Sequence, residues 1–292
     1  MKILSSVLIV LVVTILSSLA YSIERKKTLL ISDIDDTIKV SHVLNKFGVA
    51  ARAGNVTVPF TGMSQLYQLI KNENPEDTKI VYLSNAPEEI IGIPAFEFVH
   101  QTFLDVNHFP AGDLVLREDL FDPNHKVVQI RKYLEAMKPD VVIFIGDNGE
   151  RDAEIYHQIN LEYQNKSIKM VSFIHQLYSS KKKSFIYNFL DGINSNEVGK
   201  KIAAEQVGYV TPIEIAIELN QQSLLSRSYL QWMIKNVMPT IVSENYFTLD
   251  AVGMSTFPSF VACDDFIWRW TLPTDVQVAV APLRNKIKDI CN

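Results

Sequence analysis

Short apolar runs alternate with amphipathic segments of helical period through the first 178 residues of this 292-residue chain. The runs are TLLISDI at 28–34, KIVYL at 79–83, LVL at 114–116, VVIFI at 141–145 and IKMVSFI at 168–174. Between them, the segments 62–71, 93–106, 126–137 and 152–163 carry apolar residues at the spacing of one helix face. Continuous apolar strands need cover on both faces, so this order predicts an α/β domain with a central parallel sheet.

The alternation stops after residue 178, and the rest of the chain has a different pattern. The stretch TPIE at 211–214 is a capping box with proline at the first helical position, which predicts a helix start. The segment 245–292 has scattered prolines and aromatic residues without a clear period. We therefore expect a mainly helical C-terminal extension over residues 179–292, after a domain at 21–178.

The N-terminus and the cysteines bear on the cellular compartment. Residues 1–20 contain an apolar run at 7–16 followed by small residues, which is typical of a secretory signal peptide. An uncleaved membrane anchor is the alternative, although the apolar run is shorter than the roughly 20 residues of a spanning helix. Either interpretation predicts an exported domain. Cys263 and Cys291 either form a disulfide in an oxidising compartment or remain two separate thiols.

The charge of the chain limits its partners. A net charge of −5 argues against nucleic acid as the main partner, because such binding depends on dense lysine and arginine. One local exception is the run Lys181, Lys182 and Lys183, beside two aromatic residues. This run could contact an anionic lipid surface, and the alternative is a solvated linker.

Polar residues follow three of the predicted strands, at the edge where open α/β sheets bind ligands. They are Asp33, Asp35 and Thr37 after the first strand, Ser84 and Asn85 after the second, and Asp147 and Asp152 after the 141–145 run. Four carboxylates at one edge require a counter-charge, and Mg²⁺ prefers such oxygen ligands. A carboxylate can also attack phosphorus while a second carboxyl group moves the proton. The pattern therefore predicts Mg²⁺-dependent phosphoryl transfer.

The order DIDDT, VYLSN, a lysine and GDNGERD resembles the four motifs of the haloacid dehalogenase superfamily. The stretches SDIDDTIKVSHVL, PFTGMSQLYQLI, FPAGDLVLRE and IGDNGERDAEIY are similar to the catalytic domain of the actin-patch-associated phosphatidate phosphatase family. The resemblance covers about residues 28–178. It implies a three-layer α/β sandwich. The short inserts after the first and second motifs leave no room for a lid domain, so we expect a minimal cap and an open site.

The resemblance also implies roles for individual residues. Asp33 matches the nucleophile and Asp35 the general acid/base. Thr37, Ser84 and Asn85 are expected to support or bind the phosphoryl group.

The motif lysine is matched by Lys126 in DPNHKVVQI, with Arg131 or Lys132 as competing candidates. Asp33, the backbone carbonyl of Asp35, and Asp147 are the expected Mg²⁺ ligands. Asp152 belongs to the same acidic motif and is also expected in the metal site, and its alternative role is the N-cap of the following helix.

We therefore expect an exported Mg²⁺-dependent phosphatase that converts phosphatidate to diacylglycerol and phosphate. One alternative is a phosphatase for soluble sugar phosphates, nucleotides or phosphoproteins. Glu88 and Glu89 leave this choice open, because two acids after the second motif disfavour an anionic substrate on that side. A second alternative is a secreted lipid-binding or effector protein without activity.

Overall fold

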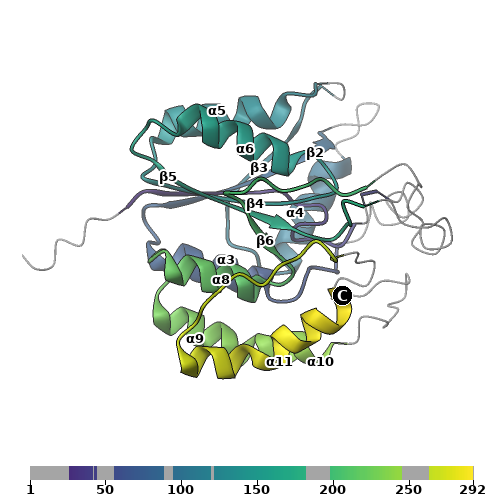
Figure 1. The fold of residues 1–292 in the computed structure, drawn as a ribbon. Coiled ribbons are helices and arrows are strands. Elements are labelled where there is room, and N and C mark those ends of the chain that lie inside the picture. Colours follow the sequence, from purple (N-terminus) through teal and green to yellow (C-terminus); the bar gives the residue numbers. More distant parts are fainter. Residues whose placement is uncertain are drawn as a thin grey trace, which may run out of the picture.

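The computed structural model describes residues 26–41, 43–44, 56–88, 95–119, 122–181, 198–244 and 263–291 (Figure 1). Its centre is a six-stranded, all-parallel sheet with the strand order β3-β2-β1-β4-β5-β6. The strands are β1 (Thr28–Ser32), β2 (Thr78–Pro87), β3 (Asp113–Arg117), β4 (Val141–Asp147), β5 (Lys169–His175) and β6 (Val207–Tyr209). The predicted parallel sheet is confirmed, and β6 is a sixth strand that the sequence did not indicate.

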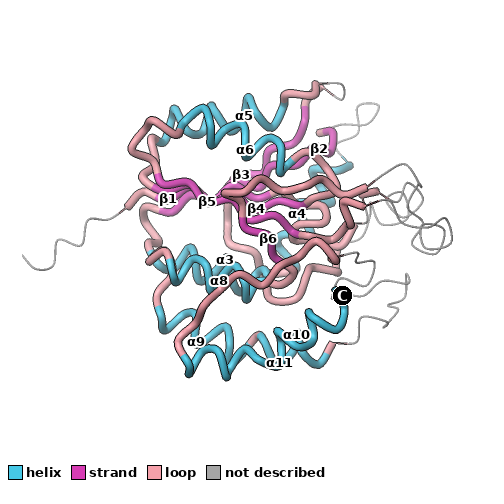
Figure 2. Tube along the Cα trace, viewed as in Figure 1, coloured by secondary structure: helices cyan, strands magenta, loops and turns pink. Residues whose placement is uncertain are grey.

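Helices cover both faces of this sheet. They are α3 (Met63–Glu73), α4 (Ala95–Val106), α5 (His125–Met137), α6 (Asp152–Tyr163), α8 (Pro212–Gln221), α9 (Arg227–Asn236), α10 (Met238–Ser243) and α11 (Thr274–Cys291). Figure 2 shows α5 and α6 on one side of the strands and α3 and α8 on the other, with α9, α10 and α11 in a further layer outside α3 and α8. The four helices predicted before residue 178 correspond to α3, α4, α5 and α6.

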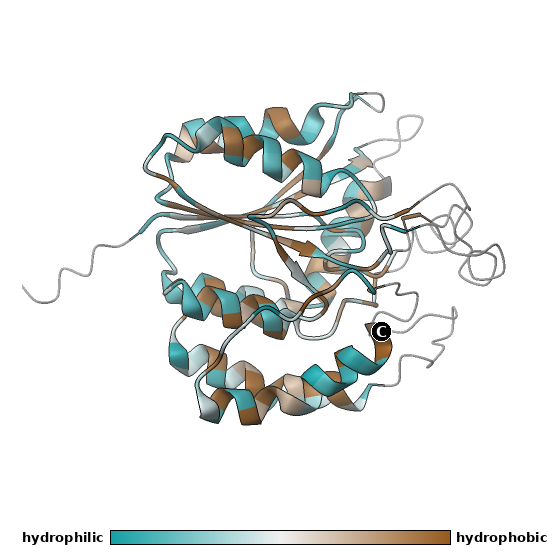
Figure 3. Ribbon diagram, viewed as in Figure 1, coloured by the Kyte–Doolittle hydropathy of each residue, from teal (hydrophilic) through white to brown (hydrophobic). Residues whose placement is uncertain are grey.

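Successive residues of each strand point to opposite faces, so each strand contributes to two cores. Leu29 and Ile31 pack in the cluster that includes α5 and α6, whereas Leu30 belongs to the cluster that includes α3 and α8. Figure 3 shows the resulting apolar character of the strands between the helical layers. This double burial explains why the strands appear in the sequence as continuous apolar runs.

The C-terminal part shares a core with the first part of the chain. Strand β6 pairs with β5, and one hydrophobic cluster joins residues of β1 and α3 to residues of α8, α9, α10 and α11. The predicted capping box is present, with both the Thr211 and Glu214 side chains bonded across the start of α8. At Gly62 a Cβ atom would lie 2.5 Å from Val237 and 2.9 Å from Pro212, so the chain passes very close to the C-terminal helices there. The boundary predicted at residue 178 thus falls between two strands of one sheet.

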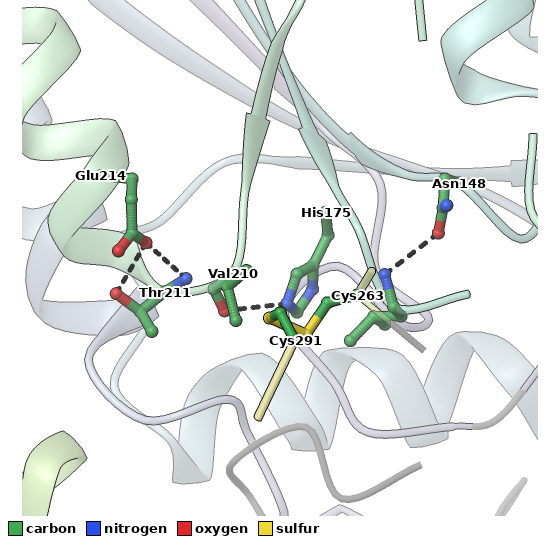
Figure 4. The surroundings of a disulfide bond; sticks show 8 residues. Asn148, His175, Val210, Thr211, Glu214, Cys263 and Cys291 are labelled. Carbon is green, nitrogen blue, oxygen red and sulfur yellow. Dashed lines mark hydrogen bonds between the residues drawn. A yellow bond between two sulfur atoms is a disulfide. The ribbon is translucent and has the colours of Figure 1, made fainter. Parts of the chain in front are cut away.

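A disulfide joins Cys263 to Cys291 at the end of α11, across a sequence separation of 28 residues. The sequence left this pairing open. Figure 4 shows the bond beside His175 and Val210. The His175 ring lies between two carbonyl oxygens, with Nδ1 2.9 Å from that of Asp36 and Nε2 3.1 Å from that of Val210. The disulfide therefore holds the end of α11 close to His175, the residue whose side chain contacts the loop after β1.

The predicted signal segment, residues 1–20, lies outside the described residues. Among the helices that the structure describes, none is both long enough and apolar enough to cross a membrane.

Candidate active site

The carboxyl ends of β1, β2 and β4 bring the predicted site residues to one edge of the sheet. Ser32 at the end of β1 lies in register with Tyr82 of β2 and with Ile145 of β4. The Asp33 N–H donates to the carbonyl of Ile145 at 2.9 Å, which continues the pairing by one residue. Ser84 lies two residues beyond Tyr82 on β2, and Asp147 lies two residues beyond Ile145 on β4. The convergence of these strand ends is as predicted.

The loop after β1 is held by Asp36. Its backbone is in the left-handed region with a φ of 58°, and its carboxylate accepts the N–H groups of Ser41 at 2.9 Å and Val43 at 2.7 Å. Its Oδ2 also accepts the hydroxyl of Tyr178 at 2.5 Å. Thr37 donates its hydroxyl to Asp33 Oδ2 at 3.0 Å. The loop therefore curls back over the strand end and fixes the orientation of the Asp33 carboxylate.

Three buried aspartates and one lysine form the centre of the site. Asp33, Asp147 and Asp152 place carboxylate oxygens within 4.8 Å of one another. Lys126, at the start of α5, donates to Asp33 Oδ1 at 2.8 Å and to Asp152 Oδ1 at 2.5 Å. Arg131 instead pairs on the protein surface with Glu162. Of the candidate cations, Lys126 is the one that meets the aspartates.

The charges in this centre do not balance. Three carboxylates face one ammonium group, and burial raises the pKa of both Asp33 and Asp147. Burial lowers the pKa of Lys126, but the carboxylates of Asp152 and Asp33 outweigh it and raise that pKa well above its usual value. The lysine therefore stays charged, and a second positive charge would favour the ionised forms of Asp33 and Asp147.

The same residues fit a divalent cation. Asp147 Oδ1 accepts the N–H groups of Gly149 at 2.5 Å and Glu150 at 3.1 Å, whereas Asp147 Oδ2 is buried without a hydrogen-bond partner among the described residues. A buried carboxylate oxygen without a partner is costly, and a metal ligand is one way to satisfy it. Asp152 is the first residue of α6, and its side chain accepts from Lys126 through Oδ1 and from the Asp147 N–H at 3.5 Å through Oδ2, so it serves this cluster. Asp33, Asp147 and Asp152 could therefore hold a metal.

Asp35 has a different environment from Asp33. Its Oδ2 lies 3.2 Å from His100 Nε2 on α4, and its Oδ1 lies 3.6 Å from the ammonium of the buried Lys39. Burial raises the pKa of Asp35, but the hydrogen bond from His100 and the charge of Lys39 outweigh it and bring the pKa below the usual range. The Asp35 carboxylate is outside the metal cluster, and the predicted ligand role of its backbone carbonyl stays a prediction.

A cavity of about 440 Å³ opens over this edge of the sheet. Ser84 and Asn85 line it, as do Asp33 and Asp35. The Ser84 hydroxyl accepts the Ala86 N–H at 3.0 Å, which leaves its proton for another acceptor. Asn85 donates to Glu150 Oε2 at 2.7 Å across the cavity. The predicted phosphate-binding residues Ser84 and Asn85 are thus beside the aspartates, although Asn85 already has a partner.

Several charged or titratable residues of the cavity were not identified from the sequence, among them Lys39, His100, Arg117 and Glu150. Lys39 lies two residues beyond the first motif and Glu150 lies inside the fourth, and these positions in the sequence were the available signal. His100 comes from α4 and Arg117 from the end of β3. No local pattern marks these two, because tertiary packing alone brings α4 and β3 to the cavity.

The predicted lysine run is only partly described. Lys181 is exposed, and its ammonium lies 3.6 Å from Asp264 and 3.9 Å from Asp265. Lys182 and Lys183 lie outside the described residues, as does Glu89. A membrane contact through this run stays a prediction.

A comparison with protein families finds a match over residues 28–176, to the model described as the catalytic domain of phosphatidate phosphatase APP1. The matched segment runs from the start of β1 to just past β5 and contains Asp33, Lys126, Asp147 and Asp152. A search of curated proteins finds no match.

Proposed function

The chain belongs to the family defined by the catalytic domain of phosphatidate phosphatase APP1, and from this premise we propose that it is a Mg²⁺-dependent phosphatidate phosphatase. The products would be diacylglycerol and inorganic phosphate. The observation that carries the proposal is the buried centre in which Lys126 holds Asp33 beside Asp147 and Asp152.

The reaction runs in two displacements at phosphorus. An oxygen of the Asp33 carboxylate attacks phosphorus, the bond from phosphorus to the glycerol oxygen breaks, and Asp35 gives that oxygen a proton. Because His100 and Lys39 hold the pKa of Asp35 below its usual range, Asp35 must first take this proton from solvent once substrate is bound. Water then attacks the phosphorus of the aspartyl-phosphate, Asp35 takes a proton from this water, and the bond to Asp33 breaks. Thr37 supports this sequence because its hydroxyl fixes one Asp33 oxygen at 3.0 Å.

Charge on the phosphoryl oxygens is offset by groups already in place. Lys126 is fully buried, so its ammonium acts in an environment of low dielectric constant where it stabilises the transition state strongly. The proton of Ser84 is available to a phosphoryl oxygen. Mg²⁺ held by Asp33, Asp147 and Asp152 would add positive charge at the same oxygens, and its preference for oxygen ligands suits this set.

We also propose that the protein acts outside the cytoplasm, on the strength of the signal-like residues 1–20. Contact of Lys181, Lys182 and Lys183 with an anionic lipid surface would place the cavity near its substrate, since each cation adds about 1 kcal/mol near such a surface.

The test is phosphate release by residues 21–292 with Mg²⁺, on phosphatidate in mixed micelles and on p-nitrophenyl phosphate. Asp33→Asn removes the nucleophile, and Asp105→Asn on the exposed surface of α4 is the matched control. We expect Mg²⁺-dependent release from phosphatidate that Asp33→Asn abolishes and Asp105→Asn retains.

Two results would contradict the proposal in different ways. Release from the soluble ester alone would keep the mechanism and replace the lipid with a soluble substrate. Release from neither substrate would favour a non-catalytic lipid-binding or effector protein.

A further inference from the structure

Arg117 is a cation in the cavity whose buried donor has no acceptor among the residues that the structure describes. It is the last residue of β3 and lines the cavity that contains Asp33 and Asp35. Its Nε is buried and has no hydrogen-bond partner in the described part of the chain. Within the described part of the chain its guanidinium forms no ion pair. Glu88 is adjacent, since its N–H donates to the Arg117 carbonyl at 2.9 Å, yet its side chain is exposed and makes no ion pair with Arg117.

This is an unfavourable arrangement unless a ligand completes it. The guanidinium is charged at all physiological pH values and presents five N–H donors in a rigid fork. A buried donor without an acceptor is destabilising, and more so when the group is charged. Native structures therefore rarely leave such a donor unpaired away from functional sites. The Arg117 Nε is the donor counterpart of Asp147 Oδ2, the buried acceptor without a partner in the same site.

The position of Arg117 indicates which part of a ligand it meets. Arg117 lies in register with Pro87, which is three residues beyond Ser84 along β2. The pairing of β2 with β3 is irregular between Leu83 and Pro87, but β3 is two strands away from β1 across the sheet. Neighbouring strands lie about 4.8 Å apart, so the Arg117 backbone is about 10 Å to the side of β1 and outside the phosphoryl position at Asp33. The cavity lining also includes the apolar residues Ala86, Pro87 and Phe96. The cavity thus combines the aspartates at the end of β1 with apolar side chains and with an arginine from β3.

We propose that Arg117 is a specificity-determining residue that donates to an oxygen acceptor in the leaving group, beyond the transferred phosphoryl group. This inference rests on the proposed function, and for a glycerolipid monophosphate the acceptor is the carbonyl oxygen of an acyl ester. A second anionic group in the same place would present the same chemistry to the guanidinium. The apolar residues Ala86, Pro87 and Phe96 in the lining favour the ester, because they suit the hydrocarbon of a glycerolipid better than a second charge.

The test compares kcat/KM on three substrates: dioctanoyl phosphatidate, its dialkyl ether analogue without carbonyl groups, and phenyl phosphate. We expect the wild type to prefer the ester over the ether by about tenfold, and Arg117→Met to remove that preference. The ratio of kcat/KM for the ester to that for phenyl phosphate should fall by about tenfold in Arg117→Met, through KM. Tenfold is the low end of what a hydrogen bond to a charged group contributes.

Arg151→Met is the matched control, because Arg151 lines the same cavity but its guanidinium already bonds Glu154 and the Pro123 carbonyl. Both ratios should be retained in this variant. Equal losses of kcat/KM on all three substrates in Arg117→Met would place Arg117 on the phosphoryl group and overturn the inference. Activity of Arg117→Met equal to that of the wild type on all three substrates would overturn it as well. A wild type that is inactive on both lipids would instead refute the proposed lipid substrate, and the inference with it.

Discussion

Lys126 Nζ lies 2.5 Å from Asp152 Oδ1, and neither side chain is exposed to solvent. A buried ion pair is strongly destabilised when one partner is removed, because the other charge remains without compensation. In this centre the same lysine also bonds Asp33, so its loss leaves three carboxylates together. The pair thus connects the stability of the fold to the proposed chemistry.

Lys126→Met is expected to lower kcat at least a hundredfold, because it removes one preorganised donor to the phosphoryl oxygens. Without metal it should also lower the free energy of unfolding by about 3–5 kcal/mol. Phosphate release and urea unfolding measure the two effects. Lys132→Met is the matched control, since Lys132 is exposed on the same helix. Equal effects of the two substitutions would contradict a central role for Lys126.

Metal removal should destabilise the folded protein. At a free Mg²⁺ concentration a hundredfold above its Kd, binding to the folded state alone adds about 2.7 kcal/mol, which raises the Tm by several degrees. Asp147→Asn is expected to abolish this rise, because Asp147 Oδ2 is the buried oxygen without a partner. Differential scanning calorimetry with Mg²⁺ or EDTA measures it, with Asp105→Asn as control. A wild-type Tm that is indifferent to Mg²⁺ would argue against a metal at this cluster.

Glu214 gives the fold a pH dependence. Burial raises the pKa of Glu214 from 4.5 to about 7, and the hydrogen bonds from Thr211 offset the rise only in part. The pKa of Glu214 is higher in the folded protein than in the unfolded chain, so protonation of Glu214 stabilises the fold. This contribution to the free energy of unfolding is complete below about pH 4.5 and is lost as the pH rises to about 7. Each pH unit between the two values is worth about 1.4 kcal/mol, so the loss is about 3 kcal/mol.

Glu214→Gln is expected to remove this loss, since the amide oxygen can still accept from Thr211 and carries no charge. The measurement is the free energy of unfolding between pH 4.5 and pH 8, with the exposed Glu97→Gln as control. Parallel pH profiles for the wild type and Glu214→Gln would show that this carboxyl group is not responsible.

The disulfide should contribute substantially to stability. Closing a loop with a separation of 28 residues restricts the unfolded chain by about 3–4 kcal/mol in the chain-entropy model. We expect dithiothreitol to lower the guanidinium chloride midpoint of the wild type accordingly. The double variant Cys263→Ala, Cys291→Ala should have the midpoint of the reduced wild type, both with and without dithiothreitol. A midpoint unaffected by reductant in the wild type would mean that the bond adds little.

The sequence predicted the elements whose signal is local. Five strands and four helices before residue 178 lie where apolar runs and helical spacing indicated, because each strand is buried on both faces. Strand β6 was not found, since three residues are too few to show a period. Helix α11 was not found either, in a segment with prolines, and Pro282 lies inside it. Residues 245–262 lie outside the described part of the chain.

The same distinction holds for the site. The meeting of Asp33, Lys126, Asp147 and Asp152 was predictable, because parallel strand ends and the start of the next helix converge by topology. The roles of His100 and Arg117 were not, because their relation to Asp35 and the cavity depends on how α4 and β3 pack. The cysteine pairing was left open for a similar reason, since spacing alone cannot tell a bridge from two thiols.

The shared core gives the family match a further meaning. The match ends at residue 176, between β5 and β6, while the hydrophobic cluster continues through α8, α9, α10 and α11. A chain cut at that point would present the apolar side of α3 and of the sheet to water and would be prone to aggregate. The stretch that carries the family resemblance is therefore smaller than the stretch that must fold together. Any exchange of the catalytic segment between relatives has to bring along a C-terminal half whose inner face matches it.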